Sequence, residues 1–162
     1  MKPAELLAVL GEFHAEKLAM RQRHAAVARH VANYSFNNTY QYVIAREDVH
    51  LAWLEAAIRE LGGAPAQVSE PVLPSPGRKP DSFLPLVQED AREAEAFVAR
   101  WRLRVGEITH ARHRSLLRVV LGEVLEHKRF FDQMLAGRDD LLGRRMDGAG
   151  TGDGVLGVRW LE

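Results

Sequence analysis

The sequence contains no cysteine, and this absence excludes two classes of structure. Without cysteine the chain can form no disulfide framework, and it cannot hold a metal through thiolates. Any metal must therefore be bound by histidine, aspartate or glutamate, and such ligands favour iron, manganese or zinc over copper(I).

The sequence also lacks an excess of charge of either sign and any long apolar run. Its 22 basic residues balance 22 acidic ones, so no overall field favours nucleic acid or an anionic membrane. No stretch reaches the about 20 apolar residues that a membrane helix needs, and the first residues do not have the form of a signal peptide. We therefore expect a cytoplasmic protein that binds neither nucleic acid nor membrane.

The sequence does contain four long segments with the periodicity of amphipathic helices. Its 162 residues, of which 46% are hydrophobic, are enough for one domain with a buried core. Within the segments, apolar residues recur in steps of three and four, which is the spacing of a helix stripe packed in a bundle. The segments cover about residues 4–32, 38–61, 84–106 and 110–136.

Two kinds of connection join these helices. Asparagine and serine side chains in residues 33–37 compete with helix geometry, so they predict a turn there. Residues 62–85 are rich in proline and lack periodicity, which predicts an extended connection. An extended segment of about 24 residues spans roughly 75 Å, whereas a helix of about 26 residues is only about 39 Å long. The connection can therefore cross the whole bundle.

We predict an all-α, up-down-down-up four-helix bundle over residues 1–137, with residues 62–85 as a long crossover between the second and third helices. Two separate hairpins would each expose an apolar stripe to water. Residues 138–162 form a Gly-rich C-terminal tail, and its apolar end, Val155 to Leu161, is expected to dock on the bundle.

Two of the predicted helices interrupt their apolar stripe with a carboxylate and an imidazole. In the second helix Glu47 and His50 take stripe positions, and in the fourth Glu123 and His127 follow the same rhythm. We therefore expect these side chains to point into the bundle, where they could hold a metal ion.

The first and third helices offer fewer candidate ligands. Lys17 takes the central stripe position of the first helix, and Glu16 lies roughly 80° away on its flank. On the third helix Ala94 occupies the centre, while Asp90 and Glu93 lie off the stripe.

Four long helices, the crossover and the motif Glu47-x-x-His50 resemble the ferritin-like superfamily, including rubrerythrin-type proteins, over about residues 4–136. The fourth helix departs from that pattern, because its order is Glu123-x-x-x-His127 or Glu123-x-x-Glu126. The resemblance implies a di-iron or mononuclear iron centre of oxidase or oxidoreductase type, and it identifies no organic substrate. The ligands that it implies are Glu47, His50, Glu123 and His127, with Glu16, Asp90 or Glu93 as conditional additions.

A second interpretation needs no metal. A buried Lys17 close to Glu47 or Glu123 would supply the positive charge that a metal supplies elsewhere. The chain would then be a metal-free bundle that acts as a structural or interaction protein, for example as a homodimer through exposed apolar residues of the tail or crossover. The residues alone leave both interpretations open.

Overall fold

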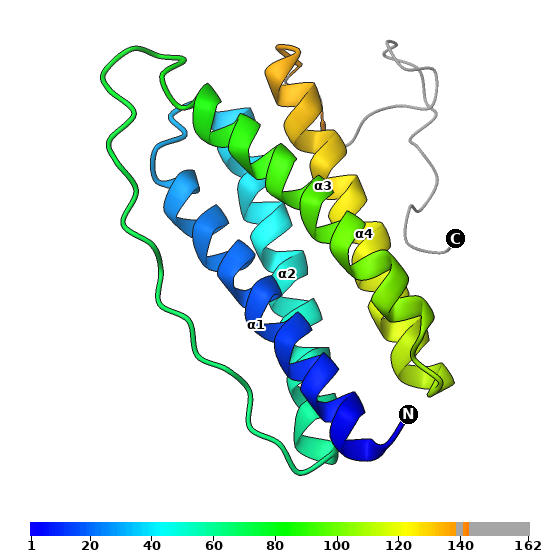
Figure 1. The fold of residues 1–162 in the computed structure, drawn as a ribbon. Helices are drawn as coiled ribbons and strands as arrows, with labels where there is room; N and C mark the ends of the chain where they lie inside the picture. Colours follow the sequence, from blue (N-terminus) through cyan, green and yellow to red (C-terminus); the bar gives the residue numbers. More distant parts are fainter. Residues whose placement is uncertain (139–140, 143–162) are drawn as a thin grey trace.

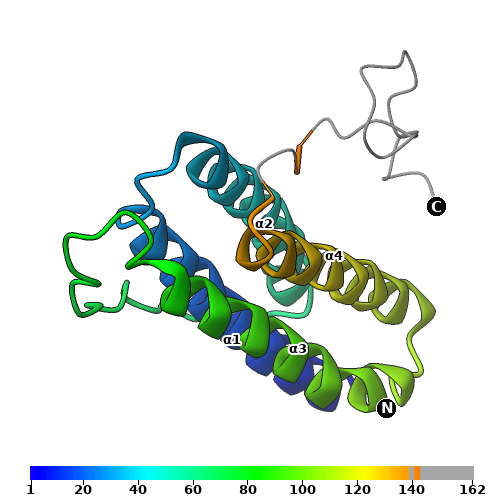
Figure 2. The same ribbon diagram turned by 90° about the horizontal axis from the view of Figure 1, so that it is seen from above.

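Four helices joined as two antiparallel hairpins make up the part of the chain that the computed structural model describes, residues 1–138 and 141–142. The first hairpin pairs α1 (Pro3–Ala28) with α2 (Tyr34–Glu60), and the second pairs α3 (Leu84–Gly106) with α4 (Ala111–Leu135). Helix α1 faces α3 and α2 faces α4, as Figures 1 and 2 show together. The prediction of an all-α four-helix bundle is therefore confirmed. None of the described helices is long and apolar enough to cross a membrane.

The long connection between α2 and α3 runs beside α1 from one end of the bundle to the other, so that α3 runs in the same direction as α2 (Figure 1). Two side chains hold this connection in place, Gln22 of α1 and Arg29, which directly follows that helix. Gln22 donates from Nε2 to the carbonyl oxygen of Val68 (2.9 Å), and Arg29 donates from Nη2 to Glu70 (3.0 Å). The crossover predicted from the proline-rich sequence is present, with Pro85 already inside the first turn of α3.

The turn between α1 and α2 lies earlier than the sequence predicts. Helix α1 ends at Ala28, not near residue 32, and α2 begins inside the predicted turn 33–37, so both boundaries were wrong. The reason is that the asparagines serve the helix ends. Asn33 caps α2 by accepting from the backbone N–H of Phe36 (3.0 Å), and Asn37 donates to the carbonyl oxygen of Ala28 (2.8 Å).

The apolar core forms two clusters, one toward each end of the bundle. The cluster nearer the N-terminus includes Leu10, Phe13, Leu54, Phe97, Trp101 and Val120. The cluster at the other end includes Val27, Tyr40, Val43, Val87, Phe130 and Phe131. The polar stripe positions of the helices lie between these clusters, so they form a layer across the middle of the bundle.

The predicted C-terminal tail lies almost entirely outside the described residues. Leu141 is described, and it is buried in the cluster of Phe130 and Phe131. The predicted docking of Val155 to Leu161 falls outside the described part of the chain.

Candidate functional site

The middle of the bundle contains a layer of buried polar side chains. Helix α1 contributes Lys17 and His24, α2 contributes Glu47 and His50, and α4 contributes His127, and all five are buried. Charged groups are seldom buried unless they are paired and hydrogen-bonded. The inward orientation predicted for Glu47 and His50 is confirmed, as is the burial of Lys17.

Glu47 is held between two nitrogen donors of α1. Lys17 donates from Nζ to Oε1, and His24 donates from Nδ1 to Oε2 (2.9 Å). Burial alone would raise the pKa of Glu47, but the charges of His24 and Lys17 outweigh it and hold this pKa well below its usual range. Burial likewise lowers the pKa of His24, and the Glu47 carboxylate outweighs it, so that this pKa is raised. Glu47 is therefore an ionised carboxylate with both oxygens occupied.

Glu123 is held in a similar way, but by residues of α2. Arg46 donates to both carboxylate oxygens, from Nε (2.9 Å) and from Nη2 (2.6 Å), and His50 Nε2 lies 2.9 Å from Oε2. Burial raises the pKa of Glu123, but the hydrogen bond from Arg46 and the charge of His50 outweigh it and lower this pKa. The Glu123 carboxylate is thus an interhelical acceptor between α2 and α4.

The two remaining histidines of the layer lie next to each other. The rings of His50 and His127 are stacked, with centroids 6.3 Å apart and an interplanar angle of 20°. Burial, followed by the nearby charge of Lys17, lowers the pKa of His50 to about 4. Burial also holds the pKa of His127 well below its usual range. In the described part of the chain, the Nδ1 atoms of both rings are buried without a hydrogen-bond partner.

Asp90 belongs to a separate set of contacts between three helices. Tyr40 of α2 donates its hydroxyl to Oδ2 (2.5 Å), and Arg23 of α1 donates from Nε to Oδ1 (2.6 Å). Burial and the adjacent Asp90 carboxylate raise the pKa of Tyr40 well above its usual value. Asp90 is fully buried on α3, and its charge is matched by Arg23.

The other two predicted ligands lie at the edge of the bundle. The side chain of Glu16 is 38% exposed and accepts from Arg100 Nη2 (2.8 Å) and Trp101 Nε1 (3.1 Å). Glu93 is partly buried and lines a pocket between α1 and α3. The structure therefore brings Glu47, His50, Glu123 and His127 to one layer and places Glu16, Asp90 and Glu93 elsewhere. Over residues 1–138 and 141–142, no three His, Asp or Glu side chains are arranged to hold a metal ion.

Sequence reasoning missed four residues that contact Glu47, Glu123 or Asp90, among them Arg23, which pairs with Asp90. Arg46 lies beside the stripe of α2, so the three-four rhythm does not select it, and His24 was not assigned a carboxylate partner. Tyr40 was counted as apolar, although a buried tyrosine hydroxyl usually finds an acceptor, and this rule could have pointed to Asp90. No protein family, curated protein or solved structure matches this chain.

Proposed function

We propose that the chain is a ferritin-like bundle in which Lys17 takes the place of a metal ion, and that it acts as a structural or interaction protein. The observation that carries this proposal is the position of Glu47, whose two oxygens accept from Lys17 Nζ and His24 Nδ1 in a fully buried layer. A buried carboxylate needs such compensation, because stranding it costs several kcal/mol, on the order of 3–5.

The same contacts oppose a metal at Glu47. A divalent cation that bound its oxygens would have to displace Lys17 or lie next to its ammonium group, and like charges at short range repel strongly in a buried site. Glu123 is engaged as well, because Arg46 and His50 occupy its two oxygens. The four central residues of the ferritin-like pattern therefore have a set of partners that fits a metal-free network better than a metal ion.

One observation favours a metal as a second candidate function. The Nδ1 atoms of His50 and His127 are buried and have no partner among the described residues, and a neutral imidazole nitrogen is a good ligand for iron or zinc. Bound iron would supply chemistry with dioxygen or peroxide. In that case His50 and His127 would be its nitrogen ligands, and Glu47 and Glu123 would have to exchange their present partners for the metal.

Metal analysis distinguishes the two candidates. We expect the protein, purified without chelator, incubated with Fe(II), Mn(II) or Zn(II) and then desalted, to retain far less than one metal ion per chain. A variant with His127→Gln should behave in the same way. Retention of about one ion per chain by the wild type, together with its loss in His127→Gln but not in a control His30→Gln, would overturn the metal-free proposal.

We further propose that the partner is a second copy of the chain, which binds through the outer faces of α2 and α4. Trp53 on α2 is 40% exposed and Val119 on α4 is 50% exposed, so two large apolar side chains of these neighbouring helices lie open to solvent. Sedimentation equilibrium should show a dimer for the wild type and a monomer for Trp53→Lys. Leu103→Lys on α3, where the side chain is 78% exposed, is the matched control and should stay dimeric. A wild type that is monomeric at all concentrations would refute this partner.

A further inference from the structure

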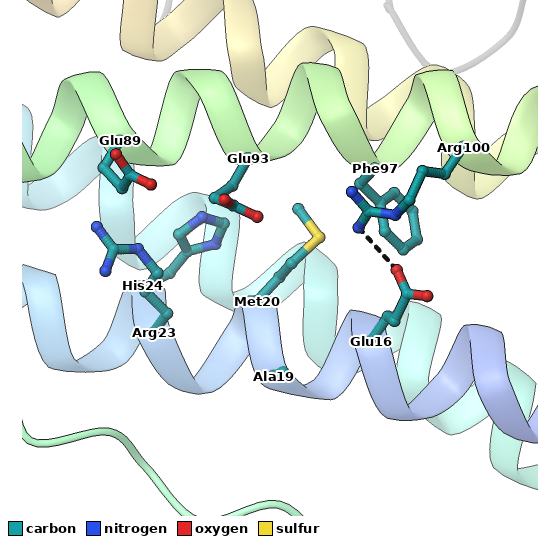
Figure 3. Close-up of a pocket in the computed structure, with 9 residues that line it drawn as sticks. All are labelled: Glu16, Ala19, Met20, Arg23, His24, Glu89, Glu93, Phe97 and Arg100. Carbon is teal, nitrogen blue, oxygen red and sulfur yellow. Dashed lines mark hydrogen bonds and ion pairs between the residues drawn. The ribbon is translucent and has the colours of Figure 1, made fainter.

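A pocket of about 450 Å³ lies between α1 and α3, beside the buried polar layer, with which it shares His24 (Figure 3). Its size is within the range of small-molecule sites, which is about 300–1,000 Å³. Glu16, Met20, Arg23 and His24 line it from α1, and Glu89, Glu93, Phe97 and Arg100 line it from α3. Figure 3 shows the carboxylate of Glu93 and the ring of His24 in the space between the two helices, with the Met20 side chain beside them.

The positive charges of this pocket are already neutralised. Arg100 is paired with Glu16 (2.8 Å), and Arg23 with the buried carboxylate of Asp90 (2.6 Å). Asp90 is fixed in turn by the hydroxyl of Tyr40, so Arg23 is not free to turn toward a ligand. An anion would therefore find no unpaired arginine on these walls.

One carboxylate that lines the pocket has no ion-pair partner in the described part of the chain. Glu89 is paired with Arg92 on the same helix, whereas Glu93 makes no hydrogen bond or ion pair within the described residues. His24, at the inner end of the pocket, is hydrogen-bonded to Glu47, which it shares with Lys17. Among the carboxylates that line the pocket, Glu93 is thus the one without an ion-pair partner in the described residues. One carboxylate is too few ligands for a metal ion but is sufficient for an ammonium group.

We propose that this pocket binds a small organic cation, a primary ammonium group on a short hydrocarbon body. Glu93 accepts hydrogen bonds from the ammonium group, and the thioether chain of Met20 packs against the hydrocarbon over the floor that Phe97 forms. The site does not involve Lys17, Arg46 or Glu123. The pocket shares His24 with the polar layer, but its tests change only Met20 and Glu93, so they can fail without affecting the proposed metal-free core.

Isothermal titration with three probes of equal length tests the charge requirement. We expect n-butylammonium to bind saturably at one site per chain, while 1-butanol and butyrate bind at least about tenfold more weakly, since the charge-assisted hydrogen bond is lost with them. Equal affinity for butanol and butylammonium would overturn the proposal, as would no saturable binding of butylammonium up to about 10 mM.

Two variants test the residues. Glu93→Gln keeps the shape of the side chain and should weaken butylammonium binding by about tenfold or more, while Glu95→Gln, an exposed neighbour on α3, should leave it unchanged. Met20→Lys places an ammonium group of the chain itself in the pocket and should abolish binding. Circular dichroism confirms that each variant keeps its helices. Unchanged binding by Glu93→Gln or by Met20→Lys contradicts the site.

Discussion

The histidines around Glu47 and Glu123 differ in pKa because their neighbours differ. Burial and the charge of Lys17 lower the pKa of His24, but the charge of Glu47, its hydrogen bond to His24 and the charge of Asp90 outweigh them, so this pKa is raised. His50 faces Glu123, which Arg46 already neutralises, and Lys17 lies nearby, so burial prevails and the pKa of His50 falls to about 4. The same residue type therefore holds its proton more strongly on one side of the layer than on the other.

This difference predicts how stability depends on pH at His50. Because its folded pKa lies below the unfolded value of 6.5, the neutral ring stabilises the fold above pH 6.5, and this contribution is lost as the pH falls toward 4. Between pH 7 and pH 5 the loss should be about 2 kcal/mol. Urea unfolding at both values should show a smaller loss of stability for His50→Gln than for the wild type.

The comparison with His50→Gln isolates His50 together with the stacked ring of His127, whose pKa depends on it. His14 also has a lowered pKa and His24 a raised one, but both are present in the two proteins and largely cancel in the difference. In the variant Glu123 keeps the two hydrogen bonds from Arg46. An equal loss of stability in the two proteins between pH 7 and pH 5 would show that His50 does not carry this pH dependence.

At the scale of the helices, periodicity alone predicted which side chains point inward. Lys17, Glu47 and His50 occupy stripe positions and are all buried, because a helix packed in a bundle turns one stripe toward its neighbours whatever residues it contains. The partners could not be predicted this way. Whether Lys17 contacts Glu47 or Glu123 depends on the rotation and level of two helices, and a stripe does not specify either.

The first turn marks a second limit of sequence reasoning. The same asparagines that disfavour a helix interior stabilise helix ends, so their presence located the turn but not the residue at which α2 begins. The position of Asn33 as the cap became clear only from its bond to the backbone of Phe36.

Replacement of this cap should measurably destabilise α2. In Asn33→Ala the N–H of Phe36 loses its acceptor, and we expect a loss of about 1 kcal/mol in the free energy of unfolding. Asn33→Asp should retain most of the stability, because its carboxylate can accept the same bond. Asn38→Ala, at an exposed position inside α2, is the control and should cost nothing. Circular dichroism monitors the thermal unfolding of each variant. Equal losses of stability in Asn33→Ala and Asn38→Ala would contradict the assignment of Asn33 as the cap.

Across the whole molecule, polar contacts join the two hairpins. Packing is more extensive within each hairpin than between them. Between the hairpins, Asp90 connects α3 to both α1 and α2, and Glu123 connects α4 to α2. At the surface, Glu12 pairs with Arg104 (2.5 Å) and Glu16 with Arg100. The buried members of this set hold the hairpins in one arrangement, because their loss leaves unpaired polar groups inside the protein.

Asp90 is the clearest test of that connection. Asp90→Ala removes the acceptor of the Tyr40 hydroxyl and the counter-charge of Arg23 at once, so we expect a loss of about 2–4 kcal/mol in the free energy of unfolding. Asp132→Ala removes only an exposed contact with Lys128 within α4 and should cost no more than about 0.5 kcal/mol. Similar losses in urea unfolding for the two variants would argue against a connecting role for Asp90.

The most direct test of the central claim is a double-mutant cycle on Lys17 and Glu47, measured by urea unfolding of the metal-free protein. If Lys17 supplies the positive charge that Glu47 needs, Lys17→Met alone should cost about 3–5 kcal/mol, because it strands a buried carboxylate. The double variant Lys17→Met/Glu47→Gln should then be more stable than Lys17→Met, with a coupling free energy of about 2 kcal/mol or more. The claim is contradicted if the loss of stability in the double variant equals the sum of the losses in Lys17→Met and Glu47→Gln. It is also contradicted if the Lys17→Met protein is as stable as the wild type and binds a metal ion.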